Sequence, residues 1–360
     1  MKKSEKIKKP MTGKRAAKIA GITLSIVIVL FVVISFVVCK MFLNMMFSRV
    51  EEPNYDRSVT FSLDDLGDMQ KRAIEFESEG STLRGYVFGE KSDKGLVVIA
   101  HGLGGVMNDY FPEMIYLVDN GYQVMMYNCT GTATSDGDGT KSLAQSATDL
   151  HHALEYVESS WAFKGMPVYL FGHSWGGYAV TAVLNYDHDI AGVVSCAGYS
   201  DCNEMLLQYI DNMLGKAGYA EYPFTKFWHW TEAGDRTELT GIGGINKSDV
   251  PVLVVQGGKD EMVLGASIYN NREDITNPNV EYYFEPESGH NDIFHSKIEC
   301  ERSYRYSKND EKAALLEQYD NNVPEDVAEK FFDGLDKEIY NKPNADLMSR
   351  VCQFYDKCGK

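Results

Sequence analysis

The stretch VYLFGHSWGG, residues 168–177, decides the fold. Its first four residues are apolar and typical of a buried strand, and the apolar sequence YAVTAVL that follows is typical of a helix. Glycine stands two residues before and two residues after Ser174. A nucleophile at a sharp turn from strand to helix needs such small neighbours, because larger side chains would collide with the turn. The stretch therefore predicts a reactive serine at the end of a strand, whereas the structural alternative is a serine in an ordinary glycine turn.

Outward from this stretch, short apolar runs alternate with helical patterns. Parallel strands joined by helical crossovers carry such runs, because both faces of their sheet are covered. The sequence therefore predicts an α/β fold with a mostly parallel sheet and helices on both faces. We expect a hairpin at Ala73–Glu79 and Thr82–Phe88, further strands at Leu96–Ala100, Tyr122–Asn128, Val168–Phe171, Ile190–Ala197, Val252–Val255 and Val280–Phe284, and helices at Asp109–Asp119, Leu143–Ser159, Tyr178–Asn185 and Ala345–Tyr355.

Two long insertions interrupt this alternation. Residues 199–249 contain an amphipathic helical pattern followed by an aromatic cluster, and we expect them to form a helical cap over the site. In residues 293–343, apolar residues recur every four positions from Val323 to Ile339, which predicts one helix with a single apolar stripe. The aromatic cluster consists of Tyr222, Phe224, Phe227, Trp228 and Trp230.

A second glycine-rich stretch, HGLGG at residues 101–105, follows the predicted strand LVVIA. Glycines at such a place let a substrate approach closely while backbone N–H groups point at a developing oxyanion. With both stretches in view, the chain resembles the α/β-hydrolase superfamily over roughly residues 73–295 and the last helix. It is nearest to the branch that holds serine aminopeptidase-like, lysophospholipase-like and carboxylesterase members. The resemblance implies oxyanion donors at Leu103 and Trp175, and we expect a structural role for His101.

The same resemblance implies an acid and then a histidine after Ser174 in the chain. After the strand PVLVV comes the turn QGGKDE, which places the acid at Asp260. A carboxylate there would orient an imidazole and stabilise its charged form. Glu261 is the local alternative, and Asp201, after the preceding strand, is a less common family position.

The histidine is expected at His290, in the loop ESGHND that follows the last predicted strand. A Gly-containing loop at that place can carry an imidazole back over the sheet edge to the serine. His295 is the nearby alternative, although no glycine precedes it.

The first 40 residues predict a membrane anchor. Ile19–Cys39 is a run of 21 residues without a charge, and as a helix it would span about 31 Å, the thickness of a bilayer core. Eight basic residues and one acid precede it, which indicates a cytoplasmic N-terminus in a single-pass protein of the cell membrane. We expect a basic cytoplasmic tail at 1–18, the anchor at 19–39, a stalk at 40–72 and an extracytoplasmic catalytic domain at 73–360. A cleaved signal peptide is the alternative.

Composition limits the partners of this chain. The net charge is −17, and because residues 1–18 carry +7, the remainder carries −24. Phosphate backbones would repel so acidic a body, so we expect no nucleic-acid partner.

No metal-ligand spacing occurs, and we expect no metal and no cofactor. The seven cysteines are expected as free thiols, with Cys196–Cys202 and Cys352–Cys358 as alternative pairs.

These observations together predict a membrane-anchored serine hydrolase with the triad Ser174, His290 and Asp260. The expected substrate is an ester, such as a lysolipid or monoacylglycerol, whose apolar group contacts Phe227, Trp228 and Trp230. A serine aminopeptidase acting on short peptides is the alternative within this fold, with cap acids such as Glu204, Glu221 and Glu232 binding the amine. A non-catalytic surface binding module is the alternative from another class.

Overall fold

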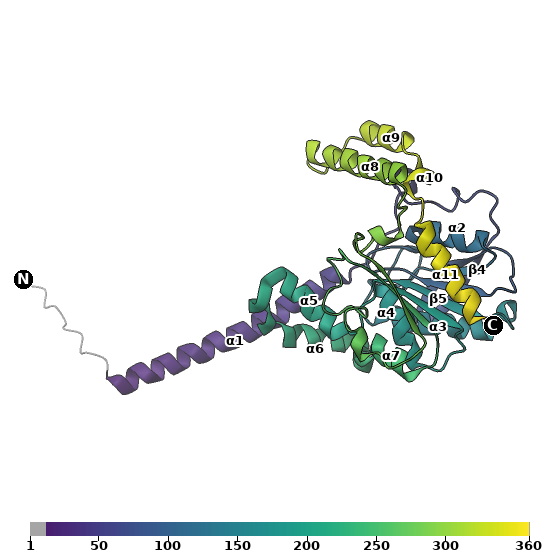
Figure 1. Ribbon diagram of the computed structural model, residues 1–360. Helices are drawn as coiled ribbons and strands as arrows, with labels where there is room; N and C mark the ends of the chain where they lie inside the picture. Colours follow the sequence, from purple (N-terminus) through teal and green to yellow (C-terminus); the bar gives the residue numbers. More distant parts are fainter. Residues whose placement is uncertain (1–11, 360) are drawn as a thin grey trace, which may run out of the picture.

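An eight-stranded sheet forms the centre of the computed structural model, which describes residues 12–359 (Figure 1). The strand order is β1-β2-β4-β3-β5-β6-β7-β8. The β1–β2 and β2–β4 pairs are antiparallel, and all other neighbours are parallel. The predicted mostly parallel sheet is confirmed. Its strands are β1 Lys71–Ser78, β2 Ser81–Phe88, β3 Leu96–Ala100, β4 Gln123–Tyr127, β5 Val168–His173, β6 Gly192–Cys196, β7 Val252–Gly257 and β8 Val280–Glu285.

Alternate residues of the central strands enter two separate cores. In β3, Val98 and Ala100 belong to one core, whereas Val97 and Ile99 belong to the other. This follows from the two-residue period of a strand, which sends neighbouring side chains to opposite faces. Both faces are apolar because helices cover both, which explains the continuous apolar runs in the sequence.

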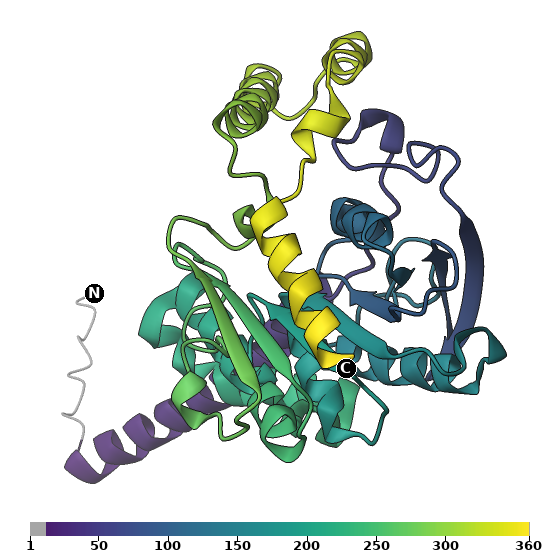
Figure 2. The same cartoon turned by 45° about the vertical axis from the view of Figure 1, so that its right-hand side comes forward.

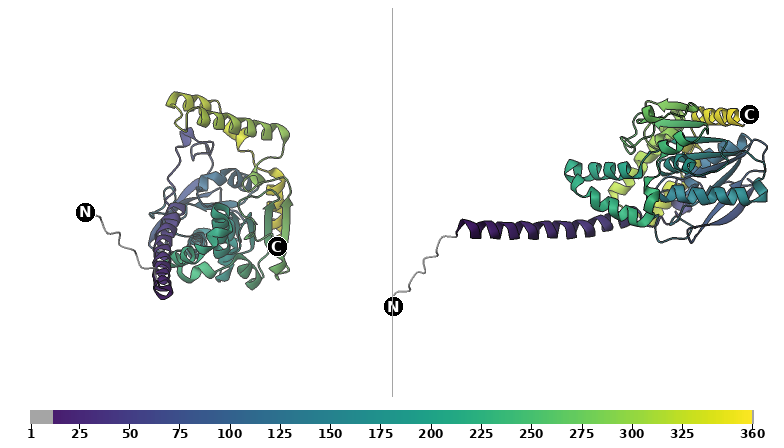
Figure 3. Two further views of the ribbon diagram at one scale, coloured as in Figure 1. Left: turned by 90° about the vertical axis from the view of Figure 1, so that its left-hand side faces the viewer. Right: turned by 90° about the horizontal axis from the view of Figure 1, so that it is seen from below.

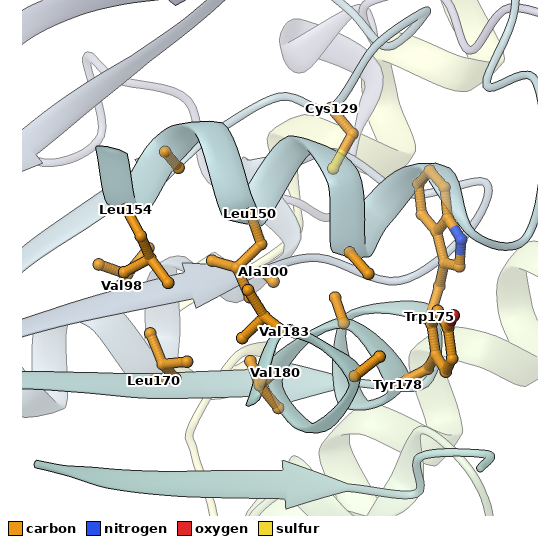
Figure 4. Packing of buried hydrophobic residues seen from close by; sticks show 14 of the residues in the cluster. Val98, Ala100, Cys129, Leu150, Leu154, Leu170, Trp175, Tyr178, Val180 and Val183 are labelled. Atoms are coloured by element: carbon orange, nitrogen blue, oxygen red, sulfur yellow. The ribbon is translucent and has the colours of Figure 1, made fainter. Parts of the chain in front are cut away.

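The first core lies beneath α3 (Gln145–Ser159), α4 (Trp175–Ala182) and α7 (Gly241–Lys247). Figure 4 shows Leu150 and Leu154 of α3 and Val180 of α4 meeting strand residues such as Val98 and Leu170. The second core lies beneath α2 (Phe111–Asp119) and α11 (Ala345–Cys358), and α11 crosses the sheet diagonally in Figure 2. The helices predicted on both faces are therefore confirmed.

A helix at the N-terminus, α1 (Gly13–Met46), extends far beyond the domain (Figures 1 and 3). It includes the predicted anchor 19–39 and is 34 residues long. Its most apolar 18-residue window has a mean hydropathy of 3.1, and only 11% of that window is buried, so the helix is long and apolar enough to cross a membrane. Residues 1–11 of the expected basic tail lie outside the described residues.

The first insertion lies beside α1, and its Gln208 also bonds to Met262 in the loop that follows β7. It contains α5 (Cys202–Leu214), η5 (Gly215–Ala220) and α6 (Tyr222–Ala233). The ring of Phe36 in α1 lies 5.2 Å from that of Phe224 and 5.4 Å from that of Phe227. The Trp228 indole N–H donates to the Phe36 carbonyl at 2.9 Å. Of the two longer helices of this insertion, α6 is the one that packs against α1.

The second insertion differs from the predicted single striped helix. It contains α8 (Glu299–Gln318), α9 (Glu325–Asp333) and α10 (Lys337–Tyr340). The stripe is divided because Gly334 caps the end of α9 and Asp336 then caps α10, accepting from the N–H of Ile339 at 2.9 Å. The sequence did not reveal α8, because none of its side chains is buried and it lacks a strong apolar face.

The expected stalk at 40–72 packs closely against the domain. Isolated bridges pair Ser48 with Gly139 and Val50 with Thr132. Further along, Asn341 donates to the Val59 carbonyl at 2.7 Å, and Lys337 donates to the Tyr55 carbonyl at 3.1 Å. We call residues 55–65 the strap, because they connect to the second insertion.

The structure contains no disulfide bond among the described cysteines. All seven cysteines lie in the described part and are free thiols, so neither the Cys196–Cys202 nor the Cys352–Cys358 pair is bonded. The short helices are η1 Tyr55–Arg57, η2 Met107–Tyr110, η3 Trp161–Phe163, η4 Val183–Asn185, η6 Gly234–Glu238, η7 Arg272–Asp274 and η8 Asp292–Phe294.

Candidate active site

Ser174 occupies a strained turn between β5 and α4. Its φ of +55° and ψ of −111° lie outside the regions that non-glycine residues favour, at a cost of about 1–3 kcal/mol. The flanking glycines make the turn possible. A Cβ atom on Gly172 would lie 2.1 Å from the Gly176 carbonyl oxygen, and one on Gly176 would lie 1.9 Å from that of Ala100. The turn leaves Ser174 half-buried on the wall of a cavity, whereas its neighbours are fully buried.

Asp260 and His290 meet at the same edge of the sheet. They follow β7 and β8, which are parallel neighbours, so their loops leave the sheet side by side. His290 Nδ1–H donates to Asp260 Oδ2 at 2.9 Å, and both side chains are buried. Because a carboxylate only accepts, this bond fixes the proton on Nδ1 and leaves Nε2 as the basic nitrogen.

The Asp260 carboxylate is held by a full set of donors. Oδ1 accepts from the N–H groups of Met262 at 2.9 Å and Val263 at 3.0 Å, and Oδ2 also accepts from Gln256 Nε2 at 2.9 Å. Burial raises the pKa of this carboxyl, but the bond from His290 and the two backbone N–H groups outweigh burial, so the pKa lies below its usual value. Asp260 therefore stays ionised and orients the imidazole.

The alternative acids and base occupy different environments. Glu261 is exposed, and Asp201 caps α5 by accepting from the N–H groups of Asn203 at 2.6 Å and Glu204 at 3.0 Å. His295 lines the same cavity as Ser174, but among the described residues no carboxylate accepts a hydrogen bond from it. Desolvation lowers the pKa of His295 to about 3.

Ser174 and His290 line one cavity of about 390 Å³ together with Leu103. No hydrogen bond joins the serine hydroxyl to the imidazole within the part of the chain that the structure describes. Such catalytic contacts often tighten only when substrate binds. The N–H groups of Leu103 and Trp175 donate to no other described group, so both remain free to bind an oxyanion.

A buried hydrogen-bond chain, which sequence reasoning missed, links the three loops of the site. The His290 carbonyl only accepts, so His173 Nε2–H donates to it at 3.1 Å. His173 Nδ1 then accepts from the Tyr110 hydroxyl at 2.8 Å, and Tyr110 Oη accepts from the Gly102 N–H at 3.0 Å. Desolvation lowers the pKa of His173 to about 3, so it stays neutral in this role. Its place next to Ser174 was the available signal, whereas nothing in the sequence marked Tyr110.

His101 has the structural role expected of it. Its Nε2 accepts from the Cys129 N–H at 3.0 Å, and its Nδ1–H donates to the Gly102 carbonyl at 2.9 Å. The ring is almost fully buried, so it shapes the loop that carries Leu103.

Comparison with known proteins agrees with this arrangement. A family model described as serine aminopeptidase, S33, matches residues 91–224. A monoglyceride lipase from Saccharomyces cerevisiae is 24% identical over 225 residues, which cover 57% of this chain and 71% of that protein. The chain belongs to the α/β-hydrolase superfamily.

Solved structures show the same fold for this hydrolase. An esterase from Pyrococcus furiosus aligns with a TM-score of 0.51 at 18% identity, covering 77% of this chain and all of the esterase. A second crystal form of that esterase aligns with a TM-score of 0.52 at 17% identity, covering 75% of this chain and 97% of the other. Together with the family match and the yeast relative, this fold identifies the chain as an enzyme of the α/β-hydrolase class.

The hydrolase does not place the predicted aromatic contacts at its cavity. Phe227, Trp228 and Trp230 are absent from the residues that line it, and α6 packs against α1 instead. The apolar surface of α1 is the partner of the Phe227 and Trp228 rings in this structure. The cavity is lined from above by two other segments, the strap with Val59, Thr60 and Phe61, and the second insertion with Arg305, Tyr340 and Asn341.

The described residues contain no group of three or more histidine, cysteine, aspartate or glutamate side chains arranged to hold a metal ion.

Proposed function

We propose that this hydrolase is a membrane-anchored esterase with Ser174 as nucleophile, His290 as base and Asp260 as the orienting acid. The observation that carries the proposal is the buried His290–Asp260 hydrogen bond beside a cavity that Ser174 also lines. A nucleophile, a base and a third group that orients the base are the parts that acyl transfer through a serine needs.

The reaction follows from these positions. Ser174 Oγ attacks the carbonyl carbon of the ester while His290 Nε2 takes the serine proton. The N–H groups of Leu103 and Trp175 stabilise the negative charge that develops on the carbonyl oxygen. The intermediate collapses, and His290 gives its proton to the departing alcohol, leaving an acyl-enzyme. Water, deprotonated by His290, then releases the acid and restores the serine.

The position of the acidic residues favours an ester over a peptide. An aminopeptidase needs an ionised acid free to bind the substrate amine, and Glu204, Glu221 and Glu232 are the cap candidates. Glu221 accepts from the Ser35 hydroxyl of α1 at 3.1 Å, and Glu232 pairs with Lys40 at 2.6 Å. None of the three cap acids, Glu204 included, lines the cavity. Monoglyceride hydrolysis by the yeast relative supports a glycerol ester as the substrate class.

The N-terminal helix supports the anchoring part of the proposal. The side chains of α1 are exposed over most of the run 19–38, and an exposed apolar surface of that length suits a bilayer. Because Lys14, Arg15 and Lys18 precede the run, its N-terminus is proposed to be cytoplasmic, with the catalytic domain on the other side.

The test is a substrate panel with the detergent-solubilised whole chain. We expect hydrolysis of p-nitrophenyl and glycerol esters and little release from aminoacyl-naphthylamides. Ser174→Ala should lower the ester rate on the order of 10³-fold or more. Hydrolysis of the naphthylamides in preference to the esters would favour the aminopeptidase alternative, and ester hydrolysis by Ser174→Ala at near wild-type rate would reject Ser174.

A further inference from the structure

Arg305 of α8 forms part of the wall of the cavity that contains Ser174. Its guanidinium is held from one side by Tyr340, to whose carbonyl Nη1–H donates at 3.0 Å. The guanidinium carbon also lies 4.5 Å from the centre of the Tyr340 ring. These contacts fix the side chain but neutralise none of its charge.

Arg305 lacks a carboxylate partner in the described part of the chain, where no acidic oxygen lies within 4.0 Å of it. Other arginines of the fold, such as Arg84 and Arg350, pair with acids. Desolvation lowers the pKa of Arg305, against the opposing charges of Asp292 and Glu113, and a guanidinium remains charged at neutral pH. A half-buried cation that no carboxylate contacts directly is costly, so an anion that enters the cavity would be stabilised there.

Two acids also line the cavity, and among the described residues neither forms an ion pair with Arg305 within 4.0 Å. Asp109 is occupied on both oxygens, accepting from the Thr60 hydroxyl at 3.1 Å and the Val106 N–H at 2.9 Å. Glu113 is buried, and desolvation raises its pKa to about 8, so at neutral pH it is largely uncharged.

We propose that Arg305 binds an anionic group, phosphate or carboxylate, on the alcohol part of the ester that Ser174 cleaves. A guanidinium presents a planar fork of N–H donors that matches either group. The cavity volume of about 390 Å³ suits a compact polar head group of this kind. The inference rests on the proposed esterase function and narrows its substrates to anionic esters.

The test uses two matched pairs of short esters with the whole chain in neutral detergent. The phosphate pair is 1-butyrylglycerol 3-phosphate and 1-butyrylglycerol, and the carboxylate pair is the butyryl esters of glycolate and ethylene glycol. We expect wild-type kcat/KM to favour the anionic member of at least one pair, and the pair identifies the anion. Inorganic phosphate is also tested as an inhibitor of ester hydrolysis, with sodium chloride at equal ionic strength as its control. This measurement distinguishes a site for free phosphate from one for an ester-linked group.

Arg305→Met should reduce the anionic-to-neutral ratio of kcat/KM by about 10- to 100-fold, the factor expected for a charge-assisted hydrogen bond. Arg305→Lys should retain part of the preference. The matched control is Arg302→Met, one turn earlier on α8 and outside the cavity lining, which should leave the ratio unchanged.

An unchanged ratio in Arg305→Met, or a wild-type preference for the neutral member of both pairs, would overturn the inference. The wild-type preference decides the matter even if Arg305→Met does not fold. Ser174-dependent hydrolysis without any anionic preference would reject the role of Arg305 alone. Absence of hydrolysis of all four esters would reject the proposed function, and the inference with it.

Discussion

The two insertions of this hydrolase have different partners. The first, through α6, packs its aromatic rings on the apolar helix α1. The second reaches the strap through polar contacts, in which Lys337 and Asn341 bind backbone carbonyls and Arg57 pairs with Glu325. Residues of the second insertion line the cavity at Ser174, whereas the aromatic cluster of the first is absent from it.

This contrast shows that aromatic content alone does not identify the segment that covers an active site. The rings of Phe224, Phe227 and Trp228 on α6 contact Phe36 of α1. The second insertion begins directly after the loop of His290, so its return path runs beside the base. The place where the second insertion leaves the sheet was therefore a better guide to the segment that lines the cavity than aromatic content was.

The largest expected effect is a loss of catalytic rate on substitution of Asp260, the partner of His290. Asp260→Asn should lower kcat by roughly 10³–10⁴-fold, because an amide cannot hold the imidazole of His290 in the required tautomer. Substrate binding should change much less, and Glu261→Gln at the exposed neighbour is the matched control. Steady-state kinetics on a short ester measure both. A nearly silent Asp260→Asn together with an inactive Glu261→Gln would show that the acid is misassigned.

The next effect concerns the contact of the first insertion with α1. Trp228→Ala should lower the free energy of unfolding by about 2 kcal/mol, because it removes a half-buried ring and its bond to the Phe36 carbonyl. Hydrolysis of a short soluble ester should stay within about twofold of wild type. Chemical denaturation in detergent and kinetics on the same samples measure these quantities. A large rise in KM without loss of stability would restore Trp228 as a substrate contact.

Features of the fold that depend on residues close together in the sequence were predictable, whereas features that depend on contacts between distant residues were not. The strand–turn–helix unit around Ser174 and the loop of His290 carry local signals, since strand patterns and flanking glycines act over a few residues. The partners of α6 and the path of the strap depend on contacts such as Lys337 with Tyr55, which are remote in sequence. A four-residue period likewise failed to predict the break at Gly334, because a periodic pattern does not specify where a helix is capped.

A smaller effect is the pH dependence of stability that the first insertion contributes through His229. This side chain is buried on α6, and desolvation lowers its pKa to about 4, below the ordinary value of about 6.5. As the pH falls from about 6.5 to 4, the unfolded chain takes up the proton before the folded one, so the free energy of unfolding decreases. His229→Gln should flatten this decrease by about one proton, or about 1.4 kcal/mol per pH unit.

Urea titrations at pH 7, 6 and 5 measure that slope, and His295→Gln provides the matching change in the other half of the comparison. His295 follows the loop of the base, and its pKa is also lowered to about 3. Equal slopes in wild type and His229→Gln would contradict the burial of this imidazole, which stacks on Phe47 and accepts from the Leu143 N–H at 3.1 Å.

The smallest expected effect concerns the strap. Lys337→Met removes the bonds from the ammonium to the Tyr55 carbonyl and to Asp65, contacts that are worth about 1 kcal/mol where they are partly exposed. We expect kcat/KM to fall about two- to fivefold, because the strap and the second insertion, which both line the cavity, would be held together less firmly. Lys312→Met, at an exposed position on α8, is the control. Identical values of kcat/KM for the two variants would show that the contact of Lys337 with the strap does not affect substrate binding.

The most direct test of the central claim is covalent labelling of the whole chain with a fluorophosphonate, followed by peptide mass spectrometry. Only a serine activated by a neighbouring base reacts rapidly with this reagent. We expect a single label on Ser174 that is lost in Ser174→Ala and forms about 10³-fold more slowly in His290→Ala. A label on another serine, or labelling of His290→Ala at the wild-type rate, would contradict it.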